Sequence, residues 1–127
     1  MQSTEAPSYA LSFAARTVVT TNSADTKADG LATRSPDADA LAIILKGASR
    51  IVQVSDAEIA EAIRIFWTDT HNLAEGAGAA SLAVALQDKR KLAGKRVGLV
   101  LTGGNIDLDL FRRWVMPATS EEMAGVS

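Results

Sequence analysis

The chain has 127 residues, of which 47% are hydrophobic and 22% are charged, with a formal net charge of -2, and this composition is typical of one globular domain. The near-neutral balance gives no field that would gather nucleic acid or anionic lipid, and no uncharged apolar run reaches the roughly 20 residues that cross a bilayer. The absence of cysteine excludes a disulfide framework and cysteine-ligated metal sites, and it fits a reducing, cytoplasmic compartment.

The first third of the chain predicts a helix, a brief strand and a loop. Residues 7–15 form a candidate helix with Leu11 on its apolar face. Residues 17–21 are all β-branched and predict a strand. Residues 22–34 are polar and predict a loop.

A strong start signal opens the next helix. Ser35 offers an acceptor for free amides, Pro36 suits the first helical position, and Asp37 faces the positive end of the helix dipole. This helix should end at Gly47, where a left-handed cap is needed. Residues 50–54 then predict a strand, because apolar β-branched residues surround one polar residue.

Ser55 and Glu58 match a capping box, in which each side chain bonds the other residue's backbone amide. Apolar residues follow at helical spacing and predict one buried stripe that runs to about His71. The stripe consists of Ile59, Ala62, Ile63, Phe66 and Trp67. Histidine is a common general base, but the place of His71 at a helix end favours a structural role with the helix dipole.

The last third predicts a helix, a strand and a final helix. Small residues at 75–80 lead into the helix, and the basic residues 89–91 suit its C-terminus. Residues 97–101 are nearly all apolar, as in a strand covered on both faces. One side of the final helix carries Ile106, Leu110, Phe111 and Trp114. Alternating strands and helices predict an α/β fold with a parallel sheet, but the expected strands are so few that the sheet looks partial.

The most informative stretch is Thr102, Gly103, Gly104 and Asn105. In open α/β sheets, ligands bind beyond the carboxyl ends of strands, and paired glycines let the backbone approach a ligand closely. Taken alone, however, this stretch is more simply explained as a turn in which Asn105 caps the next helix.

Four stretches in this order resemble the C-terminal part of threonine dehydratases and serine racemases, and they are residues 28–32, 51–59, 75–80 and 101–107. Those enzymes belong to the tryptophan-synthase-β-like, or fold type II, group of pyridoxal-phosphate-dependent enzymes. The resemblance extends from about Thr4 to Trp114. It implies that residues 1–116 are part of the cofactor-binding α/β domain, followed by a flexible tail at 117–127.

The resemblance also implies a reaction. At the position of Thr102 the family usually has serine or threonine, whose hydroxyl pairs with the pyridine nitrogen of the cofactor. A hydroxyl cannot protonate that nitrogen as a carboxylate would, which suits β-elimination. The implied activity is that of an ammonia-lyase, which converts a hydroxy amino acid such as L-threonine or L-serine to a 2-oxo acid and ammonia.

Further site residues follow from the same resemblance. Glu75 either contacts the region near the cofactor or is simply a charge at a helix N-terminus. Asp29 and Gly30 match an active-site loop, although an Asp-Gly turn also explains them. Some relatives place nucleotide or ion contacts near Asn105 and Asp107, which helix capping explains equally. The candidate cofactor-binding residues are Gly30, Glu75, Thr102, Gly103, Gly104 and Asn105.

The sequence also departs from the family. The family's N-terminal lysine motif and its phosphate loop of consecutive glycines are not in this sequence. The lysines that are present are expected in loops or on exposed surfaces, and they are Lys27, Lys46, Lys89, Lys91 and Lys95. The metal ligands of serine racemases would fall near Gln2, Ala6 and Ser8, which lack the acidic pair. We therefore expect no metal, no catalytic residue and no activity from the chain alone.

Three interpretations remain open at this point. The chain is a fragment or separately encoded piece of a lyase, a noncatalytic interaction or regulatory module that pairs with a partner, or an unrelated α/β ligand-binding domain. A truncated parallel sheet leaves unpaired edges, so we expect a homo-oligomer or pairing with an N-terminal portion.

Overall fold

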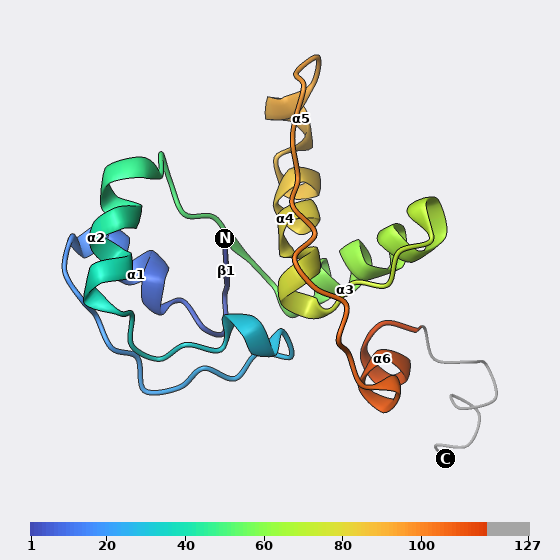
Figure 1. Cartoon of the computed structure of the whole chain (residues 1–127), viewed down its shortest axis with the longest axis horizontal. Helices are drawn as coiled ribbons and strands as arrows, with labels where there is room; N and C mark the ends of the chain where they lie inside the picture. The colour runs from blue at the N-terminus through green and yellow to red at the C-terminus, as the bar shows by residue number, and fades with distance from the viewer. Residues whose placement is uncertain (117–127) are drawn as a thin grey trace.

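The computed structural model describes residues 1–116, in which two groups of helices flank a small parallel sheet (Figure 1). Helices α1 (Ser8–Ala15) and α2 (Ala38–Gly47) form one group. The second group contains α3 (Asp56–Ile65), α4 (Gly76–Gln87), α5 (Lys89–Leu92) and α6 (Leu108–Trp114). None of the helices within residues 1–116 combines the length and the apolar character needed to span a bilayer.

The sheet pairs β1 (Gln2–Ser3) with β2 (Gln53–Val54) in parallel. Its ladder continues through the amide of Gln2, which donates to the carbonyl of Val52, and the amide of Thr4, which donates to that of Val54. The strand predicted at 50–54 is therefore present only in its last two residues, and β1 was not predicted. The parallel pairing confirms the predicted sheet type.

Two predicted strands are wrong for the chain as it stands. Residues 17–21 form a loop, because the amides of Val19 and Thr21 bond the Ser12 hydroxyl and the Arg34 carbonyl instead of a neighbouring strand. Residues 97–101 are not paired either, although they return alongside α4 (Figure 1). A β-strand forms only against a neighbour, and no neighbouring strand lies within residues 1–116 for these two segments.

The predicted ends of α2 are also corrected. The N-cap is Asp37, whose carboxylate accepts from the amide of Ala40 at 2.9 Å, and not Ser35. Gly47 is the last helical residue and has no positive φ. The chain leaves α2 through Ala48 in an extended conformation, so no left-handed glycine cap is required.

The capping box of α3 is confirmed, since the Ser55 hydroxyl and the Glu58 carboxylate each accept from the other residue's amide. Ile59, Ala62 and Ile63 are buried as predicted and pack against α4. Trp67 is instead 53% exposed. After α3 the chain continues as a π-helix, Phe66–Thr70, whose wider turns break the 3.6-residue spacing that predicted burial.

Helix α1 packs through a different face from the one expected. Leu11 is exposed, whereas Ser8 and Ser12 are buried. The Ser8 hydroxyl donates to the carbonyl of Thr33, and the Ser12 hydroxyl accepts from the amide of Val19. These bonds satisfy backbone groups of the following loop, so the small polar face is the one that the loop covers.

Helix α6 begins after Asp107, and Asn105 lies outside it. The proposal that Asn105 caps this helix is therefore wrong. Trp114 is partly buried as predicted, and its indole N–H donates to the carbonyl of Asp56 at 3.1 Å, which fixes α6 against the start of α3. The tail predicted at 117–127 lies outside the described residues.

Candidate functional site

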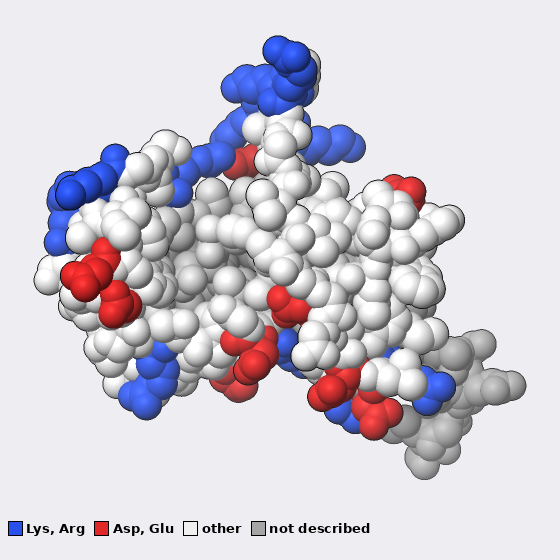
Figure 2. Space-filling model, in the orientation of Figure 1, with Lys and Arg blue, Asp and Glu red and all other residues white. Residues whose placement is uncertain are grey.

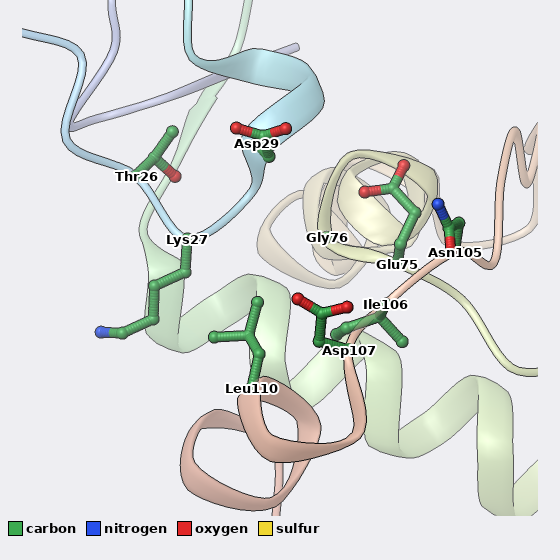
Figure 3. A pocket seen from close by; sticks show the side chains of 9 residues that line it. All are labelled: Thr26, Lys27, Asp29, Glu75, Gly76, Asn105, Ile106, Asp107 and Leu110. Carbon is green, nitrogen blue, oxygen red and sulfur yellow. The ribbon is translucent and has the colours of Figure 1, made fainter.

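Three segments that are distant in sequence meet at the N-terminus of α4 (Figure 3). They are the loop around the short 3-10 helix Asp29–Leu31, the turn at Glu75, and the stretch that follows Thr102. The sequence predicted functional residues in all three. The structure therefore brings the predicted segments together.

Glu75 is the N-cap of α4. Its carboxylate oxygens accept from the amides of Ala77 at 3.0 Å and Gly78 at 2.9 Å. A negative charge at this position is favourable, because the helix dipole is positive there. The backbone amide of Glu75 donates to the carbonyl of Gly103 at 3.0 Å. Glu75 thus fixes both the start of α4 and the segment that carries Thr102.

The close approach of this segment to α4 depends on glycine. A Cβ atom on Gly78 would overlap the carbonyl oxygen of Gly103 and would lie 2.9 Å from its amide nitrogen. A Cβ atom on Gly104 would lie 2.5 Å from the carbonyl oxygen of Leu73. The obstacles are backbone atoms, which cannot move aside as a flexible side chain can. Gly30 also packs closely against α4, since a Cβ atom on Gly30 would lie 2.8 Å from the Cβ atom of Ala77.

Thr102 is exposed at the end of residues 97–101. Its hydroxyl makes no hydrogen bond to any residue in the described range 1–116. Leu101 before it packs against the core, and Gly103 after it is bonded to Glu75. Thr102 therefore lies between two anchored residues, and its hydroxyl is free to bind a ligand atom.

A cavity of about 440 Å³ lies next to this residue cluster. Its lining includes Asp29, Glu75 and Asn105 but not Gly30, Thr102, Gly103 or Gly104. The carboxylates of Asp29, Glu75 and Asp107 face it, whereas the ammonium of Lys27 points away from them (Figure 3). Within residues 1–116, no group of His, Cys, Asp and Glu is arranged to hold a metal ion.

Sequence reasoning missed Asp56, which holds the 26–31 loop in place. Its carboxylate accepts from the Thr26 hydroxyl at 2.5 Å, the Lys27 amide at 2.8 Å and the Ser3 hydroxyl at 3.4 Å. These partners lie 29 to 53 positions away in the chain, so local spacing gives no signal for them. In the sequence, Asp56 is simply an acidic residue in the first turn of a helix.

The remaining candidates have structural positions. All lysines are exposed, as predicted, namely Lys27, Lys46, Lys89, Lys91 and Lys95. His71 is exposed at the end of the π-helix, with Nδ1 3.1 Å from the carbonyl oxygen of Trp67, which agrees with its structural interpretation. Gln2, Ala6 and Ser8 are buried, and Oε1 of Gln2 has no hydrogen-bond partner in the described residues.

Comparisons with known proteins agree on one family. Residues 1–103 match the family model described as pyridoxal-phosphate dependent enzyme. The beta-hydroxyaspartate dehydratase of Paracoccus denitrificans is 37% identical over 98 residues, which are 77% of this chain and 31% of that protein. The L-threonine ammonia-lyase of Thermotoga maritima is 38% identical over 88 residues, or 69% of this chain and 22% of that protein.

Solved structures extend this similarity to the fold. Threonine deaminase isoform 2 from Solanum lycopersicum matches 98% of this chain and 35% of its own, with a TM-score of 0.80 and 25% identity. Maize serine racemase matches 88% of this chain and 36% of its own, with a TM-score of 0.78 and 26% identity. The chain thus spans about a third or less of the length of these proteins. It belongs to the pyridoxal-phosphate dependent enzyme family, in which it corresponds to a fragment of a fold type II enzyme.

Proposed function

We propose that this chain is the C-terminal, ring-contacting part of a pyridoxal-phosphate-dependent ammonia-lyase that acts on a hydroxy amino acid. The observation that carries the proposal is the exposed Thr102 hydroxyl, which has no partner in residues 1–116 and lies between the anchored residues Leu101 and Gly103. A hydroxyl in this setting is available to donate to a ring nitrogen.

The residues present fit one edge of the cofactor. A pyridine nitrogen accepts a hydrogen bond, and Thr102 supplies a donor for it. Gly103 and Gly104 let the backbone beside this donor pack closely, since a Cβ atom on Gly103 would lie 3.4 Å from Oε1 of Glu75 and one on Gly104 would lie 2.5 Å from the carbonyl oxygen of Leu73. All the lysines of this chain are exposed. We therefore expect the groups that hold the phosphate and bond the cofactor covalently to come from the rest of the enzyme, which we call the complementary portion.

Thr102 and Glu75 have distinct tasks in this proposal. When bound, pyridoxal phosphate withdraws electrons from the α-carbon of an amino acid. The Thr102 hydroxyl orients the ring through its nitrogen without transferring a proton, because an aliphatic hydroxyl is far too weak an acid. Glu75 positions Thr102 indirectly, since its amide binds Gly103 and its carboxylate caps α4. This arrangement favours loss of a β-hydroxyl group, which carries the electrons away.

The names of the relatives indicate the substrate class. They include L-threonine ammonia-lyase, beta-hydroxyaspartate dehydratase and L-threo-3-hydroxyaspartate ammonia-lyase. All of these names refer to amino acids that carry a hydroxyl on the β-carbon. We therefore assign this chain to an enzyme that converts such an amino acid to a 2-oxo acid and ammonia.

We further propose that the isolated chain is inactive. The test is to titrate the chain with pyridoxal phosphate, reduce with borohydride and locate the pyridoxyl group by mass spectrometry. We expect only scattered, substoichiometric labelling of the exposed lysines and no release of ammonia from threonine, serine or 3-hydroxyaspartate. The Thermotoga maritima enzyme, treated in parallel, serves as the positive control. Stoichiometric labelling of one lysine of this chain would overturn the proposal.

A noncatalytic interaction or regulatory module is the second candidate. The apolar residues left exposed at 97–100 favour it, because a docking surface serves a regulator as well as an enzyme fragment. Gel filtration with the complementary portion of a relative, followed by an ammonia assay, separates the two. A complex that releases ammonia supports the lyase fragment, and a complex without activity supports the regulatory module.

A further inference from the structure

Residues 97–101 form an apolar segment that is exposed and lacks a strand partner. Val97 is 45% exposed, Leu99 40% and Val100 69%. No backbone-to-backbone hydrogen bond joins residues 97–101 to any other part of the described chain. Exposed apolar segments with free amides and carbonyls pair readily with other strands.

Contacts with α4 and the core already hold one side of this segment. The hydroxyl of Ser81 on α4 donates to the carbonyl of Val100 at 3.0 Å, and Leu101 packs against the core. In Figure 1 the segment runs along α4 from the end of α5 toward α6. In the space-filling view, the surface along α4 carries few charged side chains (Figure 2). Lys and Arg side chains gather farther along, around α5. The surface left open is thus apolar.

The extent of the match to solved structures indicates what covers this surface. The tomato threonine deaminase matches 98% of this chain but only 35% of its own length, so most of its polypeptide lies outside the match. We infer that residues 97–101 are the docking strand on which the complementary portion of the enzyme adds its own strand. This inference rests on the proposed function, because that function identifies the occupant as the rest of a fold type II enzyme.

Docking of this strand and formation of the cofactor contact are one event. Thr102 follows the strand directly, and its other neighbour Gly103 is already bonded to Glu75. Pairing of residues 97–101 adds backbone hydrogen bonds before Thr102, where Leu101 is anchored by side-chain packing but makes no backbone-to-backbone hydrogen bond. Docking of the complementary portion therefore adds to the restraint on Thr102 that Leu101 and Gly103 already provide.

The experiment co-expresses the full chain with the part of the Paracoccus denitrificans beta-hydroxyaspartate dehydratase that lies outside the matched segment. Hydrogen exchange reports pairing, while cofactor absorbance and ammonia release report the proposed function. In the chain alone we expect the amides of residues 97–101 to exchange rapidly. In the complex we expect their exchange to slow by about 100-fold or more, as in a core strand.

Gly98 provides a matched pair of variants. A Cβ atom on Gly98 meets nothing within 4 Å, and Gly98 has no positive φ, so the added Cβ atom of either variant has room in the chain alone. Gly98→Pro removes one amide donor and should weaken the complex by about tenfold or more, whereas Gly98→Ala keeps the donor and should change its dissociation constant by less than about twofold.

A second pair tests the apolar face. Val100→Asp places a charge where a strand should cover the segment, and we expect it to weaken the complex by about tenfold or more. Ile43→Asp on α2 is its control, since Ile43 is 73% exposed and Val100 69%, and we expect it to leave binding unchanged.

Each outcome is decisive. An active complex in which residues 97–101 stay unprotected, and in which Gly98→Pro binds like Gly98→Ala, overturns the docking strand while the proposed function stands. A protected strand in a complex that binds no cofactor supports the docking strand and overturns the proposed function. Protection in the chain alone, together with a dimer, shows that a second copy is the occupant and overturns the choice of partner. Failure to form any complex overturns the docking strand.

Discussion

Gly78→Ala tests the contact on which the site geometry depends. Gly78 lies in the first turn of α4, where its missing side chain lets Gly103 pack against the helix. An added methyl group would overlap the Gly103 carbonyl oxygen and lie 2.9 Å from its amide nitrogen. Both atoms belong to the backbone, so either the whole Thr102 segment or α4 must move.

Two opposing effects set the magnitude. Replacing glycine by alanine in a helix contributes up to about 1 kcal/mol of stability. Overpacking against rigid atoms costs about 1–3 kcal/mol. Displacing Gly103 also stretches the bond from the Glu75 amide, which is a loss of about 1 kcal/mol. The overlap dominates, and we expect Gly78→Ala to lower the free energy of unfolding by about 1–3 kcal/mol.

The assay is equilibrium unfolding of the chain in urea. Gly47→Ala is the control, because Gly47 is helical and a Cβ atom there meets nothing within 4 Å. We expect this control to be neutral or to gain up to about 1 kcal/mol. If Gly78→Ala stabilises the chain as much as Gly47→Ala does, the close contact between α4 and the Thr102 segment does not exist.

Two further predictions concern stability. Ser55→Ala removes the α3 cap and should cost about 1 kcal/mol in urea unfolding, while Ser49→Ala, at an exposed position, should change nothing. Hydrogen bonds from Lys91 and Arg50 lower the pKa of Asp88 from its usual value, although burial opposes them. A lowered pKa means that the stability from Asp88 is present above the pKa of the unfolded state, about 3.9, and is lost as the pH falls through the folded value. Urea unfolding of Asp88→Asn should therefore show a weaker acid dependence than the parent chain, and an unchanged profile would show that these bonds do not form.

Local signals predicted those elements whose stability is local. The capping box at Ser55 and Glu58 places α3 correctly because its bonds join residues three positions apart. The small-residue helix from Gly76 is likewise correct. Residues 97–101 have the composition of a buried strand but are unpaired, because strand formation depends on neighbours that composition does not specify. The π-helix that exposes Trp67 had no sequence signal either.

The candidate site shows the same difference between features that the sequence predicts and features that depend on distant contacts. Family resemblance selected Gly30, Glu75 and Gly103, and the structure places them around the N-terminus of α4. It did not select Asp56, whose three side-chain hydrogen bonds all reach distant parts of the chain. Resemblance thus selected residues that lie together in the structure, whereas the residue that positions the 26–31 loop became visible only through its contacts.

The central claim is that the Thr102 hydroxyl donates to the ring nitrogen of the cofactor. Its most direct test is the nitrogen NMR shift of ring-labelled pyridoxal phosphate bound to the assembled complex of this chain and the complementary portion of a relative. We predict the shift of an unprotonated, hydrogen-bonded nitrogen in the parent complex and in Thr102→Ser, and a shift toward the free nitrogen in Thr102→Ala. The same shift in all three complexes would contradict the account.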